Sequence, residues 1–120
     1  MKYGLIQTVV ISDCDIEIFT GKDIRAFLYC LVNHIGMKVA DIENPCQIWE
    51  DHTPEEDFKK GVSANIFIET SNISVHACDP QKTIRISIFT CKDHDIHKAA
   101  HYCESYWKGI CIQNMAQIVY

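Results

Sequence analysis

Three consecutive runs of alternating side chains between residues 62 and 91 constrain the fold more than any other feature of the chain. Apolar residues take every second position: Val62, Ala64, Ile66 and Ile68, then Ile73, Val75 and Ala77, then Ile84, Ile86 and Ile88. The positions between them are mostly polar, with Phe67 and Phe89 as the aromatic exceptions. Because successive side chains of a strand point to opposite faces of a sheet, the runs predict three strands that share one apolar face.

The segments on either side of these runs predict the remaining elements. β-Branched residues favour strands, and apolar residues at spacings of three and four favour helices. Gly36 and Gly109 are typical helix stops, and Pro45 favours a kink. The expected elements are a strand over residues 5–12, a helix over 22–35, a second strand region over 37–50, a helix over 93–109 and a final strand over 110–120.

Together these elements predict one domain over residues 1–120 of the α/β (α+β) class. We expect a two-layer sandwich with one mainly antiparallel sheet, two helices on one face and the order β-α-β-β-β-α-β. Two helices cover only one face of such a sheet. The other face carries Phe67 and Phe89, so we expect it to pack against a second copy of the chain and form a homodimer.

Composition narrows the choice of partners and compartment. The formal net charge is −5, from 11 Lys and Arg against 16 Asp and Glu, and clustered basic residues are absent. This argues against nucleic acid as a partner and favours a small molecule. No apolar run approaches the roughly 18 residues of a membrane span. Gln7 and Thr8 interrupt the first apolar stretch, so we expect no export signal and reduced cysteines in the cytoplasm.

The predicted strands also carry a set of side chains suited to nucleophilic and acid–base chemistry. These are Ser63, Ser71, Ser74, His76 and Cys91, which we expect on one side of the sheet. Serine and histidine are also ordinary residues on the polar side of a half-exposed sheet. From the residues alone, both interpretations stay open.

The spacing of these residues resembles that of a known family. Ser63 follows Gly61 and Val62, Ser71 lies eight residues later, His76 five beyond that, and Cys91 ends the sequence FTC. This pattern closely resembles the short, prokaryotic-type S-adenosylmethionine decarboxylases, which have approximately GVSxxxxxxESHxSxHT followed by FTCG. The agreement in element order extends over nearly the whole chain.

The resemblance implies a proenzyme that cuts itself between Thr70 and Ser71. Ser71 would become a covalent pyruvoyl group, the cofactor that forms a Schiff base with a substrate amine. By position, His76 would be the base in processing, Ser63 would orient the processing intermediate, and Cys91 would return a proton after decarboxylation. Phe67, Asn72 and Ser74 would bind the substrate. The implied reaction is decarboxylation of S-adenosylmethionine in polyamine (spermidine) biosynthesis.

The chain departs from the family pattern at several positions. Thr70 and Asn72 replace the Glu and His that flank the serine, and Lys92 follows Cys91 in place of Gly. Cys78 and Pro80 stand where the family has the adenine-stacking aromatic residue and an acidic contact.

Three alternatives to S-adenosylmethionine decarboxylation therefore stay open. The first keeps the pyruvoyl cofactor but takes another amino acid, such as arginine or ornithine. The second is an unprocessed, catalytically inactive homologue with a binding or regulatory role. The third is a zinc site among Cys91, His94, His97, His101 and Cys103, because the three histidines follow one helical side.

Overall fold

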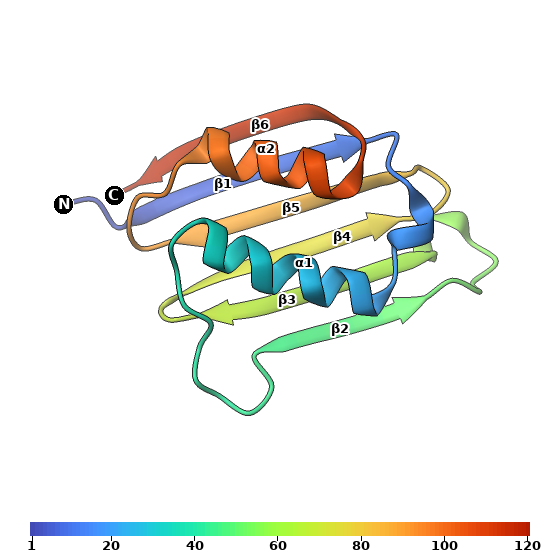
Figure 1. Ribbon diagram of the computed structural model, residues 1–120, viewed down its shortest axis with the longest axis horizontal. Coiled ribbons are helices and arrows are strands. Elements are labelled where there is room, and N and C mark those ends of the chain that lie inside the picture. Colours follow the sequence, from blue (N-terminus) through green and yellow to red (C-terminus); the bar gives the residue numbers. More distant parts are fainter.

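A single sheet of six strands organises the computed structural model, which describes residues 1–120 apart from the side chain of Asp57. The strands are β1 Gly4–Ser12, β2 Cys46–Asp51, β3 Gly61–Ile68, β4 Ser71–Cys78, β5 Thr83–Thr90 and β6 Ile110–Val119. Their spatial order is β2-β3-β4-β5-β1-β6, and each pair of neighbours is antiparallel (Figure 1). The antiparallel sheet expected from the sequence is confirmed.

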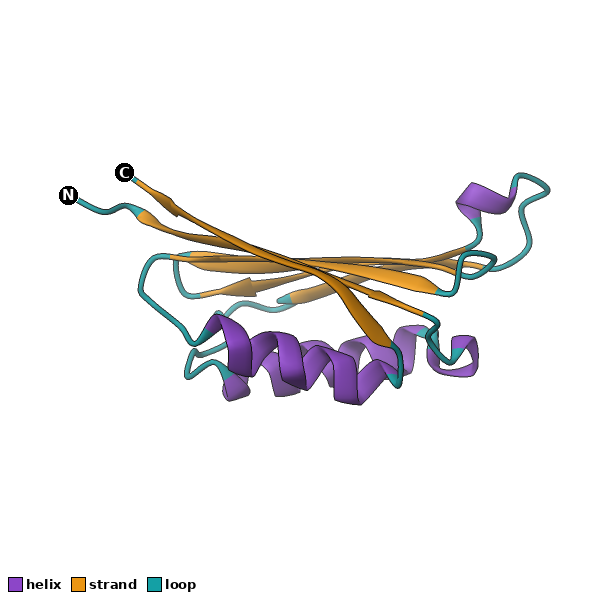
Figure 2. Cartoon of the chain, turned by 90° about the horizontal axis from the view of Figure 1, so that it is seen from above, coloured by secondary structure: helices purple, strands orange, loops and turns teal.

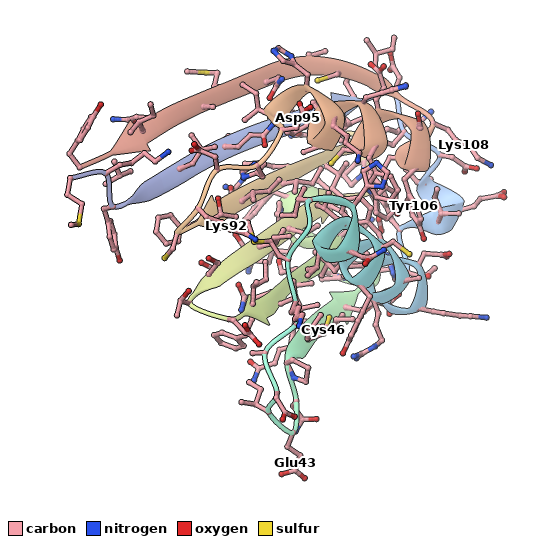
Figure 3. All side chains as sticks on the ribbon, turned by 60° about the vertical axis from the view of Figure 1, so that its left-hand side comes forward. Glu43, Cys46, Lys92, Asp95, Tyr106 and Lys108 are labelled. Carbon is pink, nitrogen blue, oxygen red and sulfur yellow. The ribbon has the colours of Figure 1, made fainter. Side chains whose placement is uncertain are left out.

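Two helices, α1 Gly21–His34 and α2 Ile96–Trp107, lie on the same face of the sheet (Figure 2). Short 3-10 turns occupy Ile16–Ile18 and Asp57–Lys59. Tyr106 of α2 points toward α1 (Figure 3), and its hydroxyl donates a hydrogen bond to the backbone oxygen of Asp23 at 3.0 Å. The α+β sandwich of two layers, with both helices on one side, is confirmed.

The observed element order is β-α-β-β-β-β-α-β, one strand more than the expected order contained. The strands expected one by one already number six, and the expected order left out one of the four strands, β2 to β5, that lie between the two helices. Most of the expected strand region over 37–50 is irregular. Before β2 it makes one isolated antiparallel bridge, between Val39 and Ile68.

The core lies between the sheet and the helices. The apolar members of the three alternating runs are all buried, as the pattern predicted. From the helices, Ile24, Phe27, Leu28, Leu31 and Trp107 are almost completely buried against them. Each fully buried side chain of this size stabilises the fold by about 1.5–3 kcal/mol relative to an exposed position.

The opposite side of the sheet is the open face, which neither α1 nor α2 covers (Figure 2). Strand register aligns its side chains in rows across the sheet. One row contains Trp49, Ser63, His76, Arg85 and Val10. A second contains Phe67, Asn72, Phe89 and Ile6. Trp49 is 72% exposed and Phe67 is 40% exposed, so large apolar side chains are left in contact with solvent.

None of the helices in the described residues is both long enough and apolar enough to cross a membrane.

We expect Leu28→Ala to lower the free energy of unfolding by about 2–5 kcal/mol, because it leaves a cavity at a completely buried position of α1. Lys22→Ala, at an exposed position of the same helix, should change it by less than about 0.5 kcal/mol. Urea unfolding followed by circular dichroism measures both. Equal effects would contradict the packing of α1 on the sheet.

Candidate active site

Ser71 is the first residue of β4 and follows a two-residue hairpin loop, Glu69 and Thr70. Thr70 has a φ of 59°, in the left-handed region. Such a conformation costs an L-residue roughly 1–2 kcal/mol, and it is rare for a β-branched side chain. Two-residue hairpins usually adopt turns in which the first loop residue has positive φ, but Glu69 does not. Backbone strain is therefore located at the residue that forms the peptide bond to Ser71.

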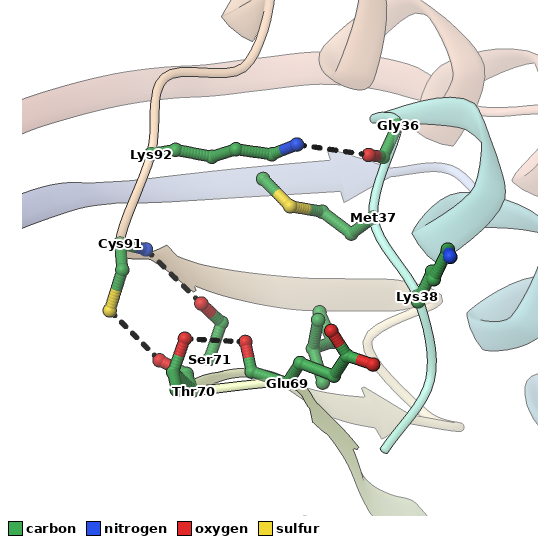
Figure 4. A pocket seen from close by; sticks show the side chains of 9 residues that line it. Gly36, Met37, Lys38, Glu69, Thr70, Ser71, Cys91 and Lys92 are labelled. Atoms are coloured by element: carbon green, nitrogen blue, oxygen red, sulfur yellow. Dashed lines mark hydrogen bonds between the residues drawn. The ribbon is translucent and has the colours of Figure 1, made fainter. Parts of the chain in front are cut away.

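Cys91, which follows the last residue of β5, contacts both sides of the Thr70–Ser71 peptide bond. Its backbone N–H donates to Ser71 Oγ at 3.1 Å, and its thiol donates to the backbone oxygen of Thr70 at 2.9 Å (Figure 4). The first contact fixes the hydroxyl oxygen beside the bond. The second provides a donor where negative charge would develop if that hydroxyl attacked the Thr70 carbonyl carbon. The arrangement suits an N-to-O acyl shift at this bond.

Two pockets flank the same bond. One, of about 440 Å³, is lined by the segment after α1 and by the hairpin loop: Gly36, Met37, Lys38, Ile68, Glu69, Thr70, Ser71, Cys91 and Lys92. Lys92 Nζ donates to the backbone oxygen of Gly36 at 3.4 Å across it (Figure 4). The other, of about 490 Å³, is lined by Ala40, Ile42, Phe67, Ile68, Thr70, Ser71, Asn72 and Phe89. A molecule bound in either pocket would contact Ser71.

Two of the three expected substrate-binding residues lie in the second pocket, Phe67 and Asn72. The Asn72 side-chain amide donates to Asn65 Oδ1 at 3.1 Å, so its orientation is fixed. Ser74 lies elsewhere on the open face, in register with Asn65 and Ser87, and lines neither pocket.

Ser63 and His76 form a separate pair across β3 and β4. Ser63 Oγ lies 3.0 Å from His76 Nδ1, and both side chains are exposed on the open face. Five residues of strand separate His76 from Ser71, which places the two roughly 16 Å apart at about 3.3 Å per residue. A single chain thus brings Ser71 together with Cys91 but does not bring His76 to Ser71.

The expectation that all five residues share one side of the sheet is wrong for Ser71. The spacing from Ser71 to His76 is odd, so the strand alternation places them on opposite faces. Ser71 has the same parity as Ile73 and Val75, which are buried beneath the helices. His76 has the parity of the open face.

The sequence analysis missed a second acid–base group, at the end of the sheet opposite Ser71. His52 Nε2 lies 2.8 Å from Glu50 Oε2, and His52 Nδ1 also contacts Asp79. Hydrogen bonding to Asp79, and then to Glu50, raises the pKa of His52. No spacing pattern indicated this group, because Glu50 and His52 lie at the end of β2 while Asp79 follows β4.

The zinc site considered from the sequence finds no support in the described part of the chain. There, no group of three His, Cys, Asp or Glu side chains converges in a way that could hold a metal ion. His94 lies before the first residue of α2 and contacts Thr90 and Gln7, while Cys103 is completely buried. The helical spacing of the histidines therefore does not translate into a shared site.

The fold and this site define an α+β domain with a serine at a strained hairpin, where a cysteine contacts the preceding peptide bond. A family model described as S-adenosylmethionine decarboxylase matches residues 8–113, and the chain belongs to that family. The resemblance seen in the sequence is confirmed. No curated protein matches the chain at a significant level.

Proposed function

We propose that the protein is a self-processing, pyruvoyl-dependent decarboxylase that acts on S-adenosylmethionine in the cytoplasm and serves spermidine biosynthesis. The observation that supports this most directly is the double contact of Cys91 with Ser71 Oγ and with the Thr70 carbonyl oxygen. Family membership supports carboxy-lyase chemistry. The substrate would be a small-molecule amine.

Processing would begin with attack of Ser71 Oγ on the Thr70 carbonyl carbon. The Cys91 thiol hydrogen-bonds the developing oxyanion, the C–N bond breaks and an ester forms, while the hydroxyl proton passes to the Ser71 nitrogen, which becomes a free amine. Removal of the Ser71 Cα proton then breaks the Cβ–Oγ bond and releases a first chain that ends with the Thr70 carboxylate. The enamine left at residue 71 takes up water and loses ammonia, which leaves the pyruvoyl group.

The residues around position 71 fit this group, because it would be made from Ser71 itself and both flanking pockets already open onto that residue. A pyruvoyl carbonyl supplies an electrophile that accepts electrons as carbon dioxide leaves. Cys91 Sγ, exposed beside the pocket, would deliver a proton to the substrate carbon afterwards. A thiol can donate a proton as a general acid, which suits that role.

A homodimer would complete the site. His76 is the proposed base for the elimination, yet it lies roughly 16 Å from Ser71 of its own chain by strand spacing. We infer that the open face packs on a second copy. Ser63 and His76 of one protomer would then reach the other protomer's pocket, in which Phe67, Asn72 and Phe89 of the open face line the approach to Ser71 at the end of the sheet. The exposed apolar side chains of that face, among them Trp49, Phe67 and Ile6, favour such burial.

A second candidate substrate class is another amino acid, such as ornithine or arginine, decarboxylated by the same group. The observation that favours it is the burial of Cys78, which is only 7% exposed. This residue offers no aromatic surface where the family pattern has one. Release of carbon dioxide from S-adenosylmethionine, ornithine and arginine, measured in parallel, distinguishes the candidates.

The purified protein should consist of two chains, residues 1–70 and residues 71–120, the second with a carbonyl at its first residue. Ser71→Ala removes the attacking hydroxyl, so that variant should stay as one chain of 120 residues. Intact-mass spectrometry measures both. Ser105→Ala, which removes an exposed hydroxyl of α2, is the matched control and should be cut. An uncut wild-type chain after prolonged incubation would mean an inactive homologue.

Cys91→Ala should still be cut, because its backbone N–H is retained, but more slowly by a factor on the order of 10²–10³ through loss of the thiol donor. Once cut, it should turn over about 10²–10⁴ times more slowly or form a different product, since the proton donor is missing. Cys91→Ser retains a donor and should recover cutting better than turnover. Full activity of Cys91→Ala would rule out the assigned role.

Mixing two defective chains tests the shared site. Co-expressed Ser71→Ala and His76→Ala chains should form mixed dimers in which one site has both Ser71 and His76. The His76→Ala chain should then be cut, although neither variant is cut appreciably alone. Gel electrophoresis of differently tagged chains measures this. As a control, a chain with both substitutions mixed with His76→Ala should stay uncut, because Ser71 is present but no His76 is; failure of the first mixture to cut would exclude a site shared between protomers.

A further inference from the structure

Two polar side chains, Gln7 and Thr90, are completely buried, and they belong to one hydrogen-bond network with His94. Gln7 Nε2 donates to the backbone oxygen of Ile96 at 2.8 Å and to Asn114 Oδ1 at 2.7 Å. Gln7 Oε1 lies 2.7 Å from His94 Nε2. Buried polar groups are costly unless they are paired, so this network fixes the residues that it joins.

The network holds the segment that carries Cys91. Thr90 is the last residue of β5 and immediately precedes Cys91, and its hydroxyl lies 2.7 Å from the backbone oxygen of Lys92 and 2.9 Å from His94 Nδ1. The connection from β5 to α2 runs past Lys92 to Asp95 (Figure 3). Through His94 this connection is tied to Gln7 of β1. The backbone at Cys91 is therefore held by Thr90 on one side and by His94 on the other, and this backbone places both contacts of Cys91 with the Thr70–Ser71 bond.

The hydrogen-bond partner of the Thr90 hydroxyl depends on a proton at His94. Gln7 Oε1 only accepts, so His94 Nε2 must carry a hydrogen. If the ring is neutral, Nδ1 accepts the single Thr90 hydroxyl hydrogen, and the Lys92 backbone oxygen receives none from Thr90. If the ring carries two protons, Nδ1 donates to Thr90 Oγ1 and the hydroxyl donates to Lys92. Protonation of His94 thus selects the partner of the Thr90 hydroxyl.

We propose that His94 is a positioning residue that acts through Thr90 to set the path of the backbone at Cys91, and with it the contacts of Cys91 with Thr70 and Ser71. The catalytic significance of this role rests on the proposed function. The effect of His94 on the position of the Cys91 thiol does not depend on that function. His94 itself touches neither Ser71 nor the proposed substrate pockets.

The pKa of His94 depends on the burial of its ring and on the charged groups around it. Burial lowers the pKa of His94, and the neighbouring Asp93 and Asp95 oppose that effect. Lys2 pairs with Asp93, and Lys92 lies on the same connection. Gln7 of β1, which contacts the ring, is neutral, and so is Asn114 of β6, which contacts Gln7. The neutral ring therefore prevails near neutral pH.

The lowered pKa also fixes the sign of the pH dependence. Below the unfolded-state value of about 6.5, the unfolded chain binds a proton at residue 94 before the folded chain does. The free energy of unfolding therefore decreases as the pH falls from about 6.5 toward the lower pKa of His94 in the folded chain. In the folded chain, the change of hydroxyl partner would occur below the same value.

The test compares variants that retain different parts of the network. Thr90→Val keeps the shape of the side chain but removes the hydroxyl, and Thr90→Ser restores it. His94→Gln can keep the contact with Gln7 but loses the one with Thr90. His97→Asn, at an exposed position on α2, is the control. The readouts are the rate of self-cleavage and the rate of Cys91 alkylation by iodoacetamide, resolved by peptide mass spectrometry and measured in the full chain from pH 5 to 8.

We expect Thr90→Val and His94→Gln to slow self-cleavage by about tenfold or more, because small displacements of a reacting group are costly. Both should alter the alkylation rate of Cys91, while Thr90→Ser and His97→Asn match the wild type. The wild-type alkylation profile should have an acidic inflection that His94→Gln lacks. If Thr90→Val does not fold, the His94→Gln variant alone tests whether His94 positions Cys91.

Alkylation does not require self-cleavage, so the two proposals fail separately. An uncut wild type whose Cys91 reactivity still depends on His94 would refute the proposed function alone. Unchanged alkylation and cleavage in both Thr90→Val and His94→Gln would overturn the positioning role and leave the decarboxylase proposal intact.

Discussion

The contact of Cys91 with the Thr70–Ser71 peptide bond is the interaction on which the functional interpretation depends. It exists because β4 and β5 pair in a register that places Asn72 opposite Phe89, so the start of one strand meets the end of the other. The donor to the serine oxygen is a backbone N–H, which any residue at position 91 would provide. The donor to the carbonyl is the thiol, which only cysteine supplies there. Strand pairing thus provides the contact with the serine oxygen, and the choice of cysteine at position 91 provides the contact with the carbonyl oxygen.

The alternation of side chains along β4 imposes the second constraint. Ser71 and His76 are five residues apart, so they are separated both along the strand and by the sheet itself. No rotamer change within one chain can join them. In the proposed mechanism, His76 would therefore serve as the base for Ser71 of a second protomer and not of its own. The same alternation that buries Ile73 and Val75 is what makes a shared site necessary in the proposed mechanism.

Most of the fold could be predicted from local patterns, because a strand with one buried face has an apolar residue at every second position. The ends of elements were less predictable. Gly109 was expected to stop the second helix, yet the left-handed residue is Lys108, and Gly109 is required because a Cβ there would lie 2.3 Å from the Ser12 backbone oxygen. Gln7 interrupts an apolar run in the sequence, and only the fold shows that it is buried and hydrogen-bonded to His94, Ile96 and Asn114. Likewise, the left-handed conformation of Thr70 depends on the two-residue loop that strand pairing leaves for it.

Sheet order explains how a cut at this position could leave the domain intact. Cleavage after Thr70 would put β1, β2 and β3 in one chain and β4, β5 and β6 in the other. In the sheet these strands are interleaved, so three ladders would join the two chains: β3 with β4, β5 with β1, and β1 with β6. The new end at Thr70 would also stay anchored, because the Glu69 N–H donates to the Lys38 backbone oxygen at 3.2 Å. Strain at Thr70 could therefore be released locally, while the pockets on either side of residue 71 keep their walls.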